Sequence, residues 1–238
     1  MSLPIILLDI EGTISPVRFI KEVLFPYASR MLPGFIRRYH DDPPIRRLLA
    51  EAQAEAGIAD PEDIDATITQ LLTWIQQDRK STSLKALQGL IWQKGYREQD
   101  FKAPVYADAY EQLAAWHAQG RAMYVYSSGS VYAQKLFFSH TEQGSLVDWF
   151  TGFFDTTTGA KQDIESYQNI VKTLQRTDAI QPRDVLFLSD VVAELEAARE
   201  AGLQTTLVVR PEDTTLNQQA LGLQGHPWIY TFKELMIR

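Results

Sequence analysis

The chain has 238 residues, of which 45% are hydrophobic and 22% charged, so it can bury a large core and is too apolar to be disordered. Its net charge of −7 argues against nucleic acid or an anionic membrane as a partner, because both require a basic surface. The absence of cysteine excludes disulfides and thiolate chemistry, and four scattered histidines disfavour a zinc cluster. The first residues lack a basic stretch and a long apolar run, so we expect a cytoplasmic protein.

The first predicted strand is Ile5–Leu8, and it runs directly into the acidic stretch DIEGT, residues 9–13. One interpretation is an acidic turn before a helix, with Thr13 or Ser15 as the N-cap. The other makes Asp9 a nucleophile or Mg²⁺ ligand, with Glu11 as a general acid or base beside it. Gly12 would then let the backbone turn tightly and approach a ligand.

Residues 18–102 carry helical patterns and no convincing strand. The clearest are Asp63–Gln76 and Ser83–Gly95, with a loop expected at residues 41–44. Such a segment is too long for a simple crossover connection. We therefore predict a core domain of residues 1–17 and 103–238, with an all-helical cap domain of residues 18–102 inserted after the first strand.

The remainder of the chain alternates predicted strands and helices, which is typical of an α/β fold. We expect a Rossmann-like parallel sheet with helices on both faces, and ligands beyond the carboxyl ends of the strands. The predicted strands are Met123–Tyr126, Val185–Leu188 and Thr206–Val209, and the predicted helices are Ala107–Ala118, Gln162–Leu174 and Ala193–Ala201.

Serines follow the second predicted strand, in the run Ser127-Ser128-Gly129-Ser130. A plain turn with a serine N-cap is one interpretation. The same geometry also suits a phosphate cradle, because serine hydroxyls and free N–H groups at a helix start bind anions.

Lys161 precedes the next predicted helix in a loop of small residues. A lone lysine is usually a solvated surface charge. At a helix start it opposes the macrodipole, so an anion such as a bound phosphate would explain its position.

Asp190 follows the apolar strand Val185–Leu188, and Glu194 lies one helical turn further on. Asp190 could be a helix N-cap and Glu194 a first-turn charge. Alternatively, Asp190 is a metal ligand, and Glu194 orients Asp190 or its bound water. We expect all four signals, namely the acid pair, the serine turn, the lysine and the final acid, at the carboxyl edge of the sheet. Together they supply the groups that phosphoryl transfer requires.

In this order of motifs the sequence resembles the haloacid dehalogenase-like phosphotransferase superfamily, whose signature is D-x-D-G-T, a Ser/Thr turn, a lysine and a final acidic motif. Here these are residues 9–13, Ser127 with Ser128, Lys161, and Asp190 with Glu194. Glu11 departs from the aspartate of most phosphatases in the superfamily.

That departure is typical of the enolase-phosphatase branch of methionine salvage. The stretches that resemble this branch are DIEGTISPVRFIKEVLFPYA, DRKSTSLKALQGLIWQKGY, YVYSSGSVYAQKLFF and FLSDVVAELEAA. The resemblance implies a monomeric enzyme with one Mg²⁺ per subunit. The implied substrate is 2,3-diketo-5-methylthiopentyl-1-phosphate, which is enolised and then dephosphorylated to an acireductone.

The resemblance also implies roles for individual residues. Asp9 would form an aspartyl-phosphate, and Mg²⁺ would be held by Asp9, Asp190 and a group at Glu11, which in the superfamily is usually the backbone carbonyl. Ser127, Ser128 and Lys161 would bind phosphoryl oxygens. Thr13, Gly12, Gly129 and Glu194 would support the site.

The base for enolisation stays open between Glu11 and a cap residue. We expect substrate discrimination in the cap at Lys80, Lys85, Gln88 and Trp92, although Trp92 also suits a cap core and Lys85 a solvated face. The rival functions are another small-molecule phosphatase on the same scaffold and a receiver-type signalling module that keeps its aspartyl-phosphate. The long helical insertion argues against the second.

Overall fold

The chain divides into two compact units in a computed structural model that describes residues 5–176, 179–212 and 225–235. The core unit consists of residues 1–18 and 103–238, and the helical unit consists of residues 19–102. Among the described residues we find no helix with the length and apolar character that a membrane span requires.

The core unit contains a parallel sheet with the strand order β3-β2-β1-β4-β5-β6. The strands are β1 Ile5–Leu8, β2 Met123–Tyr126, β3 Gly152–Phe154, β4 Val185–Ser189, β5 Gln204–Val208 and β6 Trp228–Ile229. In the centre, Ile6 lies in register with Met123 on one side and Leu186 on the other. The predicted parallel α/β core is therefore confirmed.

Four strands were expected, and β3 and β6 are the two that the sequence patterns missed. Both are edge strands of three and two residues. The residues of β3 are only half-buried, so they lack the continuous apolar run that marks β1 and β4. A segment this short carries no periodicity that could predict a strand.

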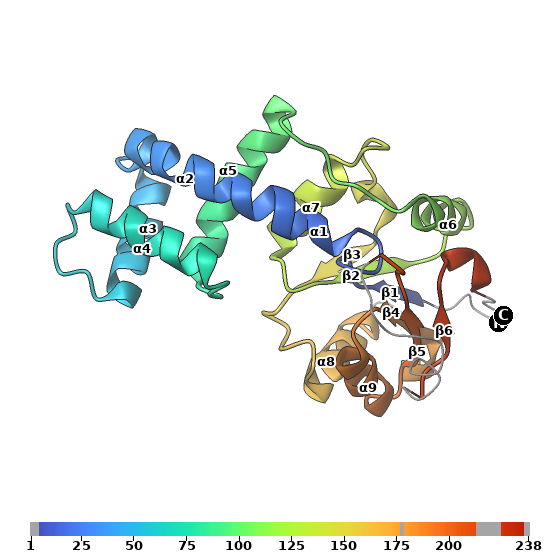
Figure 1. Cartoon of the computed structure of the whole chain (residues 1–238). Coiled ribbons are helices and arrows are strands. Elements are labelled where there is room, and N and C mark those ends of the chain that lie inside the picture. The colour runs from blue at the N-terminus through green and yellow to red at the C-terminus, as the bar shows by residue number, and fades with distance from the viewer. Residues whose placement is uncertain (1–4, 177–178, 213–224, 236–238) are drawn as a thin grey trace. The chain divides into compact units, whose positions relative to one another are not determined.

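Helices cover both faces of the sheet, with α8 and α9 together on one face and α6 and α7 on the other (Figure 1). The bounds are α6 Ala107–Ala118, α7 Val131–Ser139, α8 Ile164–Leu174 and α9 Val192–Glu200, with short 3-10 turns at Val147–Trp149, Pro182–Asp184 and Phe232–Glu234. Alternate strand residues such as Leu7 and Phe187 pack with Ile170 and Leu195 in one buried cluster. The intervening strand residues Ile6, Leu8 and Leu188 are also buried, so these strands supply apolar side chains to both faces of the sheet.

The helical unit packs around its own core. Its elements are a π-helical turn Ile20–Leu24, α2 Phe25–Tyr39, α3 Pro43–Ala56, α4 Ile64–Gln76 and α5 Thr82–Glu98, and α1 Val17–Phe19 lies at the unit boundary. Leu32, Leu71, Trp74 and Leu87 are almost completely buried there. The expected loop at 41–44 is shorter than predicted, because Pro43 and Pro44 form the first turn of α3, where proline costs no hydrogen bond.

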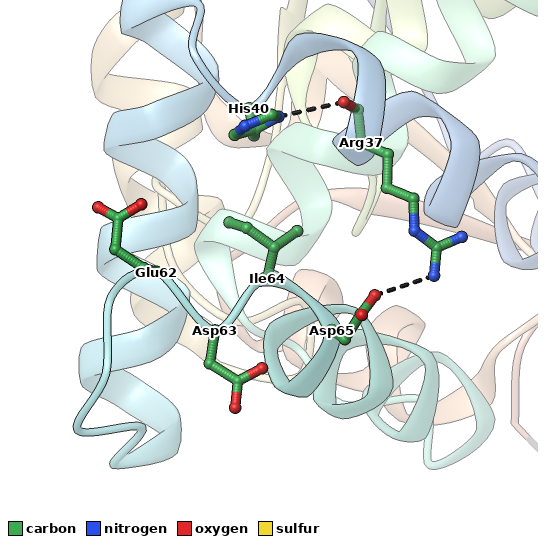
Figure 2. Close-up of a pocket in the computed structure, with 6 residues that line it drawn as sticks. All are labelled: Arg37, His40, Glu62, Asp63, Ile64 and Asp65. Atoms are coloured by element: carbon green, nitrogen blue, oxygen red, sulfur yellow. Dashed lines mark hydrogen bonds and ion pairs between the residues drawn. The ribbon is translucent and has the colours of Figure 1, made fainter.

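Figure 2 shows a pocket of about 330 Å³ in the helical unit. It is lined by Arg37, His40, Glu62, Asp63, Ile64 and Asp65. The Arg37–Asp65 ion pair beside it measures 2.9 Å, and both side chains are largely exposed. No residue predicted to carry the chemistry lines this pocket, so the candidate site lies elsewhere.

Candidate active site

The candidate site lies at the carboxyl edge of the central strands. Asp9 follows β1, Ser127 follows β2 and Asp190 follows β4. Because β1 lies between β2 and β4, the parallel sheet brings these three positions to neighbouring strand ends.

Lys161 is the cation of the site and bridges two carboxylates. Its ammonium Nζ donates to Asp9 Oδ1 at 2.6 Å and lies 2.7 Å from Glu194 Oε2. Only 9% of the lysine side chain is exposed, so it is not the solvated surface charge that an isolated lysine would suggest. Burial alone would lower the pKa of Lys161, but the charges and hydrogen bonds of the two carboxylates raise it above its ordinary value.

The loop that carries Lys161 is fixed by side-chain hydroxyls. The Tyr126 hydroxyl donates to the backbone carbonyl of Gly159 at 2.9 Å. The hydroxyls of Ser166 and Tyr167 donate to the backbone carbonyls of Ala160 and Lys161, at 2.6 and 2.7 Å. No sequence pattern marks these three hydroxyls, because the contact of β2 and the start of α8 with this loop is visible only in the fold. They hold three consecutive carbonyls, which fixes the backbone beneath the Lys161 side chain.

Glu194 takes its hydrogen bonds from two sides. Its Oε2 accepts from Ser189 Oγ at 3.0 Å in addition to the Lys161 contact. Burial and then the negative charge of Asp9 raise the pKa of Glu194, and Lys161 opposes that rise. Glu194 therefore anchors the lysine from the α9 side of the site.

Gly12 and Asp190 approach each other very closely. Gly12 has φ +71°, and a Cβ built on it would lie 2.2 Å from Asp190 Oδ2. Only glycine fits both the left-handed backbone and the space, which agrees with the tight approach expected at this position. Asp190 is not the N-cap of α9; Val191 occupies that position, and its N–H is bound by Ser189 Oγ at 3.1 Å.

The Asp190 carboxylate is suited to hold a cation. Its Oδ1 is buried and has no hydrogen-bond partner among the described residues. Burial and then the negative charge of Asp9 raise the pKa of Asp190, so a cation shared with Asp9 would stabilise both carboxylates.

The side chains do not supply a three-carboxylate metal site. Within the described part of the chain, no group of three or more His, Cys, Asp or Glu side chains is arranged to hold a metal. Asp9 and Asp190 therefore fit a hard cation that takes its other ligands from backbone carbonyl, water or substrate oxygens, as Mg²⁺ commonly does. A ligand at Glu11 would then come from its backbone.

Ser127 and Ser128 occupy different environments in the turn after β2. Ser127 is buried and its Oγ accepts from the N–H of Gly129 at 3.2 Å, whereas Ser128 is exposed. The capping role belongs to Ser130, whose side chain accepts from the N–H of Ala133. Ser127 is therefore not the cap of α7, which leaves the phosphate-binding interpretation open for it.

Two buried residues that the sequence analysis missed brace this turn. Asp155 accepts from the N–H of Val131 at 2.9 Å, at the first turn of α7. Gln134 donates to the carbonyls of Gly129 and Phe154, each at 2.8 Å. Asp155 belongs to no motif, and Gln134 lies in the stretch YVYSSGSVYAQKLFF without a role of its own, so only the fold shows that they connect the turn to the end of β3.

The capping interpretation of Thr13 and Ser15 is not supported. Both side chains are buried, and neither hydroxyl has a hydrogen-bond partner among the described residues. The turn is held by its backbone instead, with three N–H groups from residues 13–15 donating to the carbonyl of Ile10.

The predicted specificity residues lie in the helical unit, on or just before α5. Trp92 donates to the carbonyl of Leu24 at 2.8 Å and stacks on Phe25, so it contributes to the packing of this unit. Gln88 is buried, Lys85 is half-buried, and Lys80 forms an exposed ion pair of 2.6 Å with Asp78. The structure thus separates a packing residue, Trp92, from the more accessible Lys80 and Lys85.

Most of the chain matches one protein family and its curated members. The model of the haloacid dehalogenase-like hydrolase family matches residues 3–202. Enolase-phosphatase E1 of Methylococcus capsulatus is 52% identical over 206 residues, which cover 86% of this chain and 88% of that protein. Enolase-phosphatase E1 of Pseudomonas aeruginosa is 45% identical over 237 residues, which cover 100% of both chains. The crystal structure of the UTR4 protein of Saccharomyces cerevisiae is similar with a TM-score of 0.79 and 32% identity, over 98% of this chain and 100% of that one.

Proposed function

Because the chain belongs to the haloacid dehalogenase-like hydrolase family, and within it to the enolase-phosphatases, we propose that it enolises and dephosphorylates 2,3-diketo-5-methylthiopentyl-1-phosphate in methionine salvage. The products are the acireductone 1,2-dihydroxy-3-keto-5-methylthiopentene and phosphate. One observation carries the proposal most directly. Lys161 holds Asp9 and Glu194 together at the sheet edge that also carries Asp190, within a chain 52% identical to an enolase-phosphatase.

Phosphoryl transfer begins at Asp9. An oxygen of its carboxylate attacks phosphorus and the bond from phosphorus to the substrate oxygen breaks, leaving an aspartyl-phosphate that water then hydrolyses. The departing oxygen needs a proton, and the Glu11 side chain, two residues from the nucleophile, is our candidate donor. Lys161 and Ser127 would hold the phosphoryl oxygens, where negative charge must be stabilised.

In the proposed reaction, one Mg²⁺ ion per subunit would be held by the side chains of Asp9 and Asp190 and by the backbone carbonyl of Glu11. The buried, unpartnered Asp190 Oδ1 supports this choice. When bound, the ion supplies positive charge to the nucleophile, the phosphate and the developing enediolate.

Enolisation requires a base for a carbon-bound proton. Glu11 and a side chain of the helical unit are the two candidates. We propose that the helical unit acts as a cap that selects the substrate, with Lys80, Lys85, Gln88 and Trp92 as candidate specificity residues. Of these, Lys80 and Lys85 are the more accessible, whereas Trp92 and Gln88 take part in packing. From the family resemblance we also infer a cytoplasmic monomer that acts on a small phosphorylated molecule.

An anaerobic assay tests the proposal by following both half-reactions in one sample. The purified chain is mixed with the diketo phosphate and Mg²⁺, enediol formation is followed by ultraviolet absorbance, and released phosphate is measured separately. We expect both signals, and the loss of both when a chelator is added. Phosphate release from sugar or nucleotide phosphates, with none from the diketo phosphate, would favour a different phosphatase on the same scaffold.

A further inference from the structure

Arg210 is a buried cation that no predicted motif includes. It stands two residues after β5 and is 4% exposed. Its Nη1 donates to both carboxylate oxygens of Asp108, at 3.0 and 2.9 Å. A buried guanidinium is costly unless it is paired and its N–H groups are satisfied, so the partners of Arg210 indicate its role.

The other edge of the Arg210 guanidinium points at the acidic loop of the candidate site. Its Nε and Nη2 both donate to the backbone carbonyl of Thr13, at 3.1 and 2.7 Å. Thr13 is 197 residues away in sequence and directly follows Gly12. Two charge-assisted hydrogen bonds to one buried carbonyl fix the orientation of that peptide group.

The surroundings of Arg210 leave it little freedom. Its Cζ lies 4.1 Å from the centroid of the Tyr106 ring, and the N–H of Tyr106 donates to the carbonyl of Ile14 at 2.9 Å. Asp108 in turn accepts from the N–H of Phe232 at 2.8 Å. Side chains at the start of α6 and in the last 3-10 turn therefore fix the position of Arg210. Arg210 in turn binds the Thr13 carbonyl of the 9–13 loop.

The position of this loop matters because of its contact with Asp190. Gly12 leaves no room for even a Cβ between the loop and the Asp190 carboxylate. A shift of the Thr13 peptide would therefore push Gly12 against Asp190. The displaced Asp190 carboxylate would then lie at a different distance from Asp9. Displacements of about 1 Å at a catalytic group can reduce a rate by about a hundredfold.

We propose that Arg210, held by Asp108, is a positioning residue that fixes the 9–13 loop for phosphoryl transfer, an inference that rests on the proposed function. Among the described residues, the hydrogen bonds and ion pair of Arg210 go to Thr13, Asp108 and Tyr230, and none of them reaches the predicted nucleophile or phosphate cradle. Its effect would reach the reaction through the Thr13 carbonyl.

The test compares R210K, R210M and D108N with the wild-type enzyme, and uses R199M as the matched control. Arg199 also donates to a backbone carbonyl, that of Gly225 at 3.1 Å, and pairs with Glu196. Neither partner belongs to the 9–13 loop. For each folded variant we would measure kcat and KM for the diketo phosphate at saturating Mg²⁺. Hydrogen exchange of backbone amides 9–15 in the metal-free protein gives a second readout that needs no activity.

For R210M we expect kcat to fall by about 10- to 100-fold with KM changed by less than about threefold, and amides 9–15 to exchange at least about tenfold faster. D108N should show a smaller effect in the same direction, and R199M none. If R210M does not fold, the proposal is tested with R210K and D108N, using the same two readouts, the kinetic constants and the exchange of amides 9–15.

Folded Arg210 variants with wild-type kcat and wild-type exchange at residues 9–15 would overturn the proposal. A wild-type enzyme that releases no phosphate from the diketo phosphate would instead mean that the proposed function has failed. In that case the exchange data alone decide whether Arg210 holds the loop.

Discussion

Lys161 and Asp9 are 152 residues apart in sequence, yet the Lys161 Nζ lies 2.6 Å from Asp9 Oδ1. The same ammonium also contacts Glu194, so one buried cation serves two carboxylates, with Asp190 close enough for the charge of Asp9 to raise its pKa. A nucleophile surrounded by other acids would repel a phosphate monoester. Lys161 offsets part of that charge, and the remainder explains why the site would favour a divalent cation.

Replacing Gly12 with alanine should damage the site far more than the same change at Gly57. Both glycines have φ +71°, but a Cβ on Gly57 meets no atom within 4 Å, whereas on Gly12 it overlaps Asp190. G57A should cost about 1 kcal/mol of unfolding free energy for the left-handed backbone. G12A should cost about 3 kcal/mol and abolish phosphate release. Urea unfolding and the phosphate assay check both, and equal costs at the two positions would contradict the close approach.

Removing the charge of Lys161 should destabilise the fold as well as the reaction. K161M leaves Asp9 and Glu194 buried without their cation, which should cost about 3 kcal/mol of unfolding free energy at neutral pH. Adding E194Q to K161M should restore about 1 kcal/mol or more, because the neutral amide needs neither the lost cation nor the proton that the buried Glu194 carboxyl would otherwise take up. Urea unfolding of the two single variants and the double variant completes the cycle. Additive effects would show that the two residues do not interact.

Asp190 should control stabilisation by Mg²⁺. A metal present at 100 times its dissociation constant adds about 2.7 kcal/mol to the stability of the folded state. D190N should lose most of this gain, because it removes a carboxylate whose Oδ1 has no other partner in the described structure. The exposed D163N near the same loop serves as the control. Melting temperatures with Mg²⁺ and with a chelator measure the effect, and an undiminished Mg²⁺ shift in D190N would remove this residue from the metal site.

His226 should contribute to the loss of stability in acid. It is buried, with Nδ1 2.8 Å from Thr205 Oγ1, and burial and then the charge of Arg199 lower its pKa from 6.5. The folded state therefore binds a proton less readily than the unfolded state, so the stability present above pH 6.5 is lost as the pH falls through the lowered pKa. In H226Q the difference in urea stability between pH 7.5 and pH 5.5 should be smaller than in the wild type. The exposed H117Q is the control, and an unchanged difference in H226Q would show that His226 makes no such contribution.

The sequence was sufficient for the central strands because their apolar runs are continuous and buried. β1 and β2 have the predicted bounds, and β4 extends one residue further. Parallel pairing then determines which residues meet, since the carboxyl ends of neighbouring strands share one edge. This is why Asp9, Ser127 and Asp190 could be assigned to one site before any contact was known.

What the sequence could not provide were contacts made by residues without a motif. Arg210 resembles any arginine after a strand, and its link to Thr13 exists only once β5 and β1 share a sheet. The hydroxyls of Tyr126 and Tyr167 likewise look like ordinary core aromatics until the loop at 159–161 is placed against them. The roles predicted for the site residues themselves stay predictions that the experiments address.

The most direct test of the account is to detect phosphate on Asp9 during turnover. The enzyme is mixed with the diketo phosphate and Mg²⁺, quenched in acid within one turnover, and its peptides are analysed by mass spectrometry. We predict a phosphoryl group on the peptide that contains Asp9, and neither that label nor phosphate release in D9N. Normal phosphate release by D9N, or wild-type turnover with the label on another residue, would contradict the assignment of Asp9 as the nucleophile.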